Sequence, residues 1–135
     1  MTEQTIVNAV IDTLTIDGFT VATEVANFYR SADVGALARN GDVWVVECKV
    51  SSIGQAIKQA KTHKLSADKV FIATLYKNTR EKTLRRIREA GLGLLYVMPD
   101  GSVSNPVEQP KQNTPWGLAR KRLSERILEL REKNA

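Results

Sequence analysis

Apolar residues recur every three or four positions between residues 3 and 15, and this spacing places them on one face of a helix. Gly18 follows shortly afterwards and suits the end of such a helix. The pattern predicts an amphipathic helix at the start of the chain. Its apolar face comprises Ile6, Val7, Val10, Ile11 and Leu14.

The next three segments are rich in β-branched and aromatic residues, which favours strands. They cover residues 19–29, 33–38 and 43–50. Asn40 and Gly41 separate the second segment from the third, and Asn-Gly between two apolar runs is a strong hairpin signal. We therefore expect three consecutive strands in an antiparallel meander.

The remainder of the chain alternates between helical and strand patterns. Ser51 or Ser52 is placed to cap the next helix, and Asn78 with Glu81 three residues later resembles a capping box for another. The predicted elements are a helix over about 53–65, a strand over 69–76, a helix over about 79–90, a strand over 93–98, a connector over 102–115 and a helix from Thr114-Pro115.

These elements predict an α/β fold with the core order αβββαβαβ and an additional C-terminal helix. The helical crossover between the third and fourth strands favours a parallel, right-handed connection, so the sheet should be mixed and covered by helices on both faces. We expect a core domain over residues 1–100. Residues 101–135 should form a connector and a basic amphipathic helix that packs on, or extends, the same domain.

The composition indicates an ordinary globular domain. The chain has 135 residues, of which 42% are hydrophobic and 26% charged, as in ordinary globular domains. Its single cysteine excludes an intramolecular disulfide, and no apolar run is long enough to span a membrane. The first residues include Glu3 and Asp12 and do not resemble a signal peptide, so we expect a cytoplasmic protein. The net charge of +5 favours a polyanionic partner such as nucleic acid.

An acidic and a basic residue interrupt the apolar strand over 43–50. Glu47 and Lys49 are two positions apart and therefore share one face, whereas Cys48 points to the other and should lie in the core. Whether Asp33 joins them depends on the hairpin loop. A two-residue loop turns Asp33 away, whereas a three-residue loop with Gly41 in a left-handed conformation places Asp33 directly opposite Glu47. The metal-site hypothesis requires the second register.

Two carboxylates that face each other repel unless a cation lies between them. Oxygen ligands suit Mg²⁺, which commonly binds one or two carboxylates and keeps several waters. Asp33 and Glu47 are thus candidate metal ligands, with the backbone carbonyl of Cys48 as a third. Lys49 is a candidate for activating the water or holding the phosphate, and Glu24 for extending the acidic cluster.

This set of residues resembles the PD-(D/E)xK nuclease superfamily, which has the restriction-endonuclease-like fold. The matching motifs are Ala32-Asp33, Glu47-Cys48-Lys49 and Gln59 on the following helix, and the resemblance spans residues 3–98. It implies that Asp33 and Glu47 bind Mg²⁺ or Mn²⁺ and that Lys49 assists the hydrolytic water. Glu24 resembles the additional acidic residue of many members.

The resemblance departs from the family pattern at two positions. Ala32 stands in place of the motif's proline, and His63 stands where a tyrosine is frequent. We expect His63 to lie on the surface near a helix end. Gln55 is a second candidate, beside Gln59, for the glutamine of the motif. The small size is most similar to compact Holliday junction resolvases or phage-type nucleases.

Two predicted helices are rich in basic residues, either as solvated faces or as contacts to a phosphate backbone. The C-terminal one also carries an apolar stripe that packs on the core or pairs with a second subunit, formed by Trp116, Leu123, Ile127 and Leu130. We take DNA as the expected partner, with RNA as an alternative. A homodimer is a further expectation, because one small site cuts one strand per encounter. The candidate nucleic-acid-binding residues are Arg80, Lys82, Arg85, Arg86, Arg120, Lys121 and Arg122.

The sequence therefore predicts a metal-dependent nuclease that hydrolyses DNA phosphodiester bonds, most simply as an endonuclease. One alternative is a non-cleaving nucleic-acid-binding or assembly module on the same fold. The other is an unrelated α/β interaction protein in which Glu47 and Lys49 form a surface pair and Asp33 caps a turn.

Overall fold

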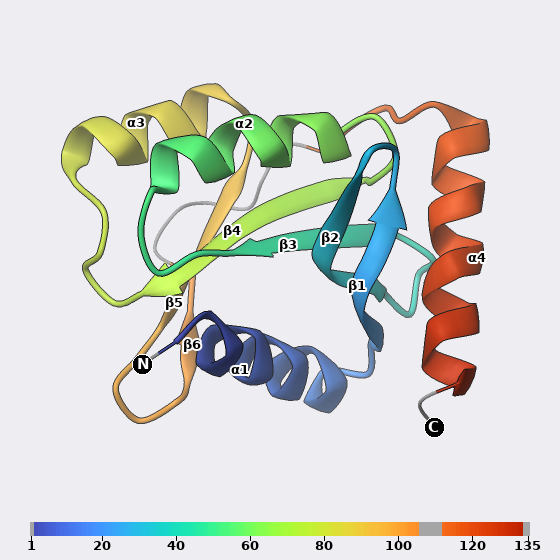
Figure 1. Cartoon of the computed structure of the whole chain (residues 1–135), viewed down its shortest axis with the longest axis horizontal. Coiled ribbons are helices and arrows are strands. Elements are labelled where there is room, and N and C mark those ends of the chain that lie inside the picture. The colour runs from blue at the N-terminus through green and yellow to red at the C-terminus, as the bar shows by residue number, and fades with distance from the viewer. Residues whose placement is uncertain (1, 106–111, 134–135) are drawn as a thin grey trace.

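The computed structural model describes residues 2–105 and 112–133. The helices of this part are α1 (Glu3–Ile16), α2 (Ile53–His63), α3 (Glu81–Glu89) and α4 (Gly117–Lys133). The strands are β1 (Thr20–Asn27), β2 (Arg30–Leu37), β3 (Val43–Cys48), β4 (Lys69–Leu75), β5 (Gly93–Val97) and β6 (Val103–Ser104). The predicted order αβββαβαβ and the C-terminal helix are thus confirmed (Figure 1).

In the described residues the strands form one six-stranded sheet in the order β1-β2-β3-β4-β5-β6. The first three strands are antiparallel, β3, β4 and β5 are parallel, and β6 pairs antiparallel with β5. The mixed sheet agrees with the prediction. The connector predicted over 102–115 needs correction, because Val103–Ser104 forms an edge strand, and residues 106–111 lie outside the described part.

Helices cover both faces of the sheet, and each face has its own apolar core. α1 buries Ile6, Val10 and Leu14 against one face together with Val46 and Cys48 of β3. The other face contains the longer apolar cluster, to which α2, α3 and α4 contribute Ile57, Ile87, Leu123 and Ile127. The alternation along β3 thus separates Cys48 from Glu47 as the strand period predicts.

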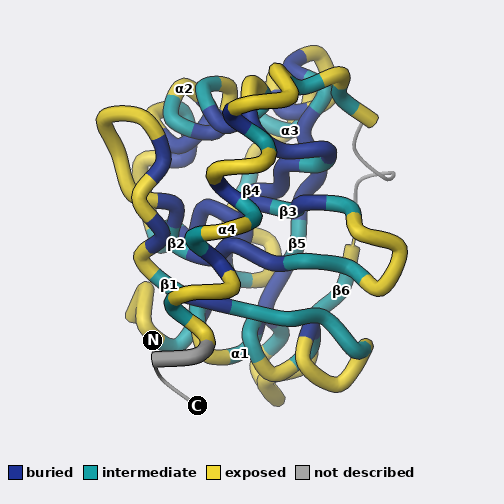
Figure 2. The backbone as a smooth tube through the Cα atoms, turned by 90° about the vertical axis from the view of Figure 1, so that its right-hand side faces the viewer, coloured by how far each residue is buried: buried dark blue, intermediate teal, exposed yellow. Residues whose placement is uncertain are grey.

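α4 packs against the β1 and β2 end of the sheet. Leu123 and Ile127 are fully buried there, whereas Trp116 of the predicted stripe lies before the helix and is 63% exposed. Figure 2 looks onto α4, along which exposed and buried positions alternate turn by turn. Gly35 of β2 makes this contact possible, because a Cβ there would lie 3.0 Å from the Ile127 side chain. The predicted stripe therefore packs on the chain's own core.

The cap predictions were only partly correct. Ser52 is the N-cap of α2, but its φ of 58° is left-handed and its side chain makes no capping hydrogen bond. α3 begins after Arg80, and the Asn78 amide instead donates to the Val50 carbonyl and the Thr74 hydroxyl, so the predicted capping box is absent from α3. Pro115 likewise precedes α4 instead of occupying its first turn. In the described residues no helix has the length and apolarity needed to cross a membrane.

Candidate functional site

The β2–β3 hairpin decides whether the predicted acidic residues meet. Val34 pairs with Val46 and Leu37 with Val43, and continuing this register one step places Asp33 opposite Glu47. The Ala38 N–H donates to the Asp42 carbonyl at 2.9 Å, which leaves Arg39, Asn40 and Gly41 as the loop. Gly41 has φ +92°, as a three-residue loop requires. The structure thus has the register that the metal-site hypothesis needs.

Asp33 is half-buried at the point where β2 approaches the end of β3. Its Oδ2 accepts a hydrogen bond of 2.8 Å from the Cys48 backbone N–H, which fixes the carboxylate against β3. Burial and the negative charge of Glu47 together raise the pKa of Asp33 from 3.8 to about 7, and Glu24 adds to this rise. Burial and the neighbouring Glu47 carboxylate thus favour the protonated form of Asp33.

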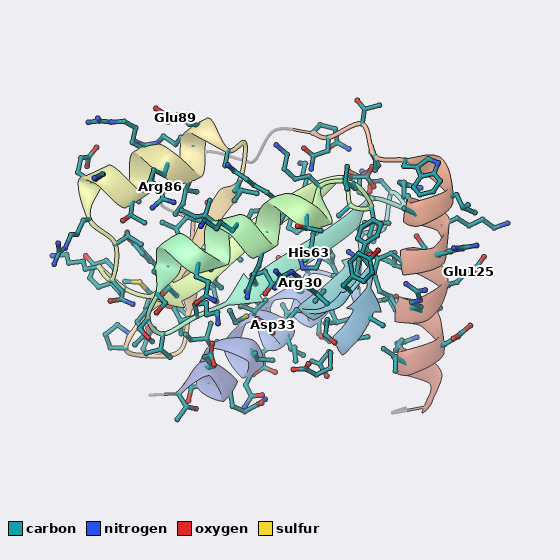
Figure 3. The ribbon with its side chains drawn as sticks, turned by 45° about the horizontal axis from the view of Figure 1, so that its top comes forward. Arg30, Asp33, His63, Arg86, Glu89 and Glu125 are labelled. Atoms are coloured by element: carbon teal, nitrogen blue, oxygen red, sulfur yellow. The ribbon has the colours of Figure 1, made fainter. Side chains whose placement is uncertain are left out.

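Glu47 is buried, with 3% of its surface exposed, and it faces α2. The Nε2 atom of His63 lies 2.7 Å from Oε1 of Glu47 in a close polar contact that lacks the alignment of a hydrogen bond. His63 is the last residue of α2 and is completely buried (Figure 3). The default expectation of a surface histidine is therefore wrong.

A buried polar network fixes the other side of the His63 ring. The Asn27 side-chain amide lies 2.7 Å from His63 Nδ1 and donates to the Ser66 hydroxyl at 2.8 Å. The Ser66 hydroxyl in turn is close enough to donate to the Asn27 carbonyl oxygen at 3.1 Å. With the amide donating to Nδ1, the ring carries its hydrogen on Nε2, toward Glu47. His63 thus links the candidate site to β1.

Asp33, Glu47, Lys49 and Gln59 line one pocket of about 410 Å³. Lys49 directly follows β3, and its Nζ lies 3.8 Å from a carboxylate oxygen of Glu3 on α1. The structure thus brings together both carboxylates, the lysine and the glutamine of the predicted site. The remaining lining residues are Glu3, Tyr29, Arg30 and Ser31.

Glu24 and Gln55 lie beside this pocket without lining it. Glu24 is exposed on β1, in register with Asp33 at a break in the β1–β2 ladder, and has φ 50°. Gln55 is exposed on α2, one turn before Gln59, and lines two neighbouring pockets. The structure therefore favours Gln59 over Gln55 as the glutamine of the site.

Cys48 combines a buried side chain with a backbone that contacts the site. Its thiol is 2% exposed in the core under α1, and burial raises its pKa well above the usual range. The prediction of a core cysteine is thus confirmed. Its N–H already binds Asp33, so this residue positions the carboxylate through its main chain.

The predicted nucleic-acid-binding residues do not form one surface, because α3 and α4 lie at opposite ends of the molecule (Figure 1). Arg86 of α3 lines a pocket next to the site. Arg120 of α4 instead pairs with Asp68 at 2.9 Å and donates to the Gly41 carbonyl, so it holds α4 to the sheet. The others, Arg80, Lys82, Arg85, Lys121 and Arg122, are exposed.

Sequence reasoning missed several residues of this region. The burial of His63 had a signal, because Ile53, Ala56, Ala60 and His63 continue one helical stripe. Arg30, Glu3 and Tyr29 reach the pocket only through the folding of the sheet and α1, and no local pattern points to them.

Comparisons with known proteins support the fold alone. No protein-family model and no curated protein matches the chain. A solved structure of a protein of unknown function from Silicibacter pomeroyi superposes with a TM-score of 0.78 at 21% identity, covering 99% of this chain and 88% of that one. SfsA from Pyrococcus furiosus, in complex with Ca²⁺, gives a TM-score of 0.42 at 13% identity, over 79% of this chain and 61% of that one.

Proposed function

We propose that this protein is a metal-dependent nuclease of the PD-(D/E)xK type, which hydrolyses phosphodiester bonds in DNA. The observation that carries the proposal is that Asp33, Glu47, Lys49 and Gln59 line one pocket. These four residues are the ones that the family resemblance predicts. The hairpin register that places Asp33 opposite Glu47 is set by the loop at Gly41 and not by the motif residues themselves. An unrelated protein with a surface Glu-Lys pair has no reason to bury Glu47 or to hold Asp33 beside it.

The donor set fits a hard divalent cation. Two carboxylates held side by side, with the pKa of Asp33 raised to about 7, are stabilised by a cation between them. In residues 2–105 and 112–133 no group of three His, Cys, Asp or Glu side chains is placed to hold a metal ion. Asp33 and Glu47 would therefore hold Mg²⁺ or Mn²⁺ with a backbone oxygen such as the Cys48 carbonyl and with water, as Mg²⁺ commonly allows.

The protein side chains have separate tasks around such an ion. The bound ion supplies Lewis acidity and lowers the pKa of water. Lys49 presents its ammonium group to the same pocket and binds the phosphate or stabilises the hydroxide that attacks it. Gln59 orients water or phosphate through its amide. His63 holds Glu47 from behind, so the carboxylate does not need to reorganise when substrate binds.

A cleavage assay tests the proposal. Wild type, Lys49→Ala and Lys61→Ala are incubated with labelled duplex, branched and single-stranded DNA and with RNA, in Mg²⁺, Mn²⁺ or EDTA. Lys61 is the matched control, because it is exposed on α2 and does not line the pocket. We expect metal-dependent cutting that falls by roughly 10²-fold or more in Lys49→Ala and stays unchanged in Lys61→Ala.

Two other results would replace the proposal. Salt-sensitive binding without cutting by any variant would define a non-cleaving nucleic-acid-binding module. Neither binding nor cutting would leave the interaction-protein alternative. Light scattering on DNA-bound protein tests the homodimer, and a strict monomer would contradict it.

A further inference from the structure

A second pocket opens beside the carboxylate pocket. It has a volume of about 520 Å³ and lies along α2 and α3. Arg30 and Gln59 line both pockets, so the two pockets lie side by side. A molecule bound at Asp33 and Glu47 that extends past Gln59 therefore enters this second pocket. Its lining residues are Arg30, Gly54, Gln55, Lys58, Gln59 and Arg86.

The second pocket is positively charged. Arg30, Lys58 and Arg86 are cationic and exposed, and its other lining residues are neutral. Among the described residues, none of the ion pairs uses any of these three cations. Exposed cations gathered around a concave site whose other lining residues are uncharged create a positive potential there. The pocket is therefore suited to an anion.

The guanidinium of Arg86 lies close to Gly54. A Cβ at Gly54 would lie 3.1 Å from Nη1 of Arg86, so the absence of a side chain lets the guanidinium lie against the first turn of α2. Arg86 belongs to α3, which lies beside α2 (Figure 3). The cations thus come from β2, α2 and α3, elements that converge only in the folded chain. Guanidinium groups bind phosphate oxygens through two donors at once, and the amides of Gln55 and Gln59 add further donors.

We propose that this basic pocket, formed by Arg30, Lys58 and Arg86, binds a phosphate group of the substrate strand next to the phosphate that is cut. The inference rests on the proposed function for its substrate class. The phosphate belongs to an internal diester or to a 5′-terminal monophosphate. In either case the pocket positions the strand so that the neighbouring phosphate reaches Asp33, Glu47 and Lys49.

Binding measured without metal tests this proposal separately from cutting. The variants Arg86→Gln and Lys58→Gln are compared with Arg88→Gln and Lys61→Gln, which are exposed on the same two helices and do not line the pocket. Fluorescence anisotropy gives the Kd for a 3′-labelled single-stranded oligonucleotide in EDTA over a salt series. One strand carries a 5′-phosphate and another a 5′-hydroxyl.

We expect Arg86→Gln and Lys58→Gln to weaken binding several-fold at low salt. Each should reduce the magnitude of the slope of log K against log salt by about 0.7, as the loss of one phosphate contact on a single strand does. The control variants should bind like wild type. Equal weakening for both strands identifies an internal phosphate, whereas weakening confined to the 5′-phosphorylated strand identifies a terminal monophosphate.

The proposal is overturned if the pocket variants and the control variants have the same Kd and salt slope. Far-ultraviolet circular dichroism confirms that each variant is folded. Failure of the cleavage assay leaves this measurement unaffected, since no metal is present. Conversely, if the pocket variants cut DNA and bind it as wild type does, the result would support the proposed nuclease activity and reject the phosphate-binding role of the pocket.

Discussion

Replacing Asp33 by Asn should stabilise the protein in metal-free buffer at alkaline pH but not at acid pH. In the folded chain burial and Glu47 raise the pKa of Asp33 from 3.8 to about 7, so ionisation above neutral pH acts against folding. Asn has nearly the same shape and no charge. Its side-chain oxygen is able to accept the hydrogen bond that the Cys48 N–H now donates to Asp33.

The sign of the pH dependence follows from proton counting. Between pH 3.8 and about 7 the folded protein retains a proton on Asp33 that the unfolded chain has lost. The free energy of unfolding therefore falls as the pH rises through this window. Below this window Asp33 is protonated in both the folded and the unfolded state, so it does not change the free energy of unfolding. Above the window Asp33 is ionised in both states, and the full reduction in the free energy of unfolding remains.

The magnitude follows from the same pKa values. A rise from 3.8 to about 7 corresponds to about 4 kcal/mol, at about 1.4 kcal/mol for each pKa unit. Asp33 is only half-buried, so solvent screening reduces this value and we expect a gain of about 1–2 kcal/mol. In a domain of this size such a gain raises Tm by roughly 3–8 °C.

Urea unfolding of wild type and Asp33→Asn in EDTA, at about pH 4 and about pH 8, measures the effect. Asp12→Asn is the control, because Asp12 is exposed on α1. The variant should be the more stable protein at the higher pH and nearly equal to wild type at the lower. With Mg²⁺ in place of EDTA, wild type should gain stability and Asp33→Asn should not. A gain independent of pH, or a less stable variant at the higher pH, would refute the reasoning.

Two further predictions concern α4. Ile127→Ala should reduce the free energy of unfolding by about 3 kcal/mol, because it removes a fully buried side chain from its contact with Gly35; a loss below about 1 kcal/mol in urea would show that α4 is not part of the core. Arg120→Ala should cost about 1 kcal/mol, since the buried Asp68 loses its partner while Arg120 is partly exposed. The same change in an Asp68→Asn background should cost less, and equal costs would exclude their coupling.

The site was predictable from sequence where local geometry determines it. The Asn40-Gly41 pair predicted a hairpin but left a two-residue and a three-residue loop open, and the structure has the three-residue loop, whose register carries Asp33 to Glu47. The period of two along β3 then separates Glu47 from Cys48. The hairpin and the strand alternation depend on a few residues and were predictable, whereas the length of the hairpin loop was decided only by the folded structure.

Predictions failed where a distant segment offered a better partner. Asn78 has the sequence context of a helix cap, yet its amide binds the Val50 carbonyl and the Thr74 hydroxyl, because β4 ends beside the β3–α2 connection. His63 is polar and close to a helix end, yet Asn27 binds one ring nitrogen and Glu47 faces the other, while Ser66 holds the Asn27 amide in place. A buried polar group is stable only when such partners exist, and they lie far away in the sequence.

Three of the four non-glycine residues with positive φ in the described part of the chain lie near the carboxylates, and Lys77 is the fourth. Glu24, Phe28 and Ser52 adopt positive φ values of 50°, 58° and 58° without being glycine. Glu24 lies in register with Asp33, Phe28 directly precedes the pocket residue Tyr29, and Ser52 lines a smaller pocket that shares Lys49 with the site. Such residues each cost of order 1 kcal/mol and persist only where the surrounding fold determines them. This strain lies in the same region of the fold as Asp33, whose pKa burial and Glu47 raise to about 7.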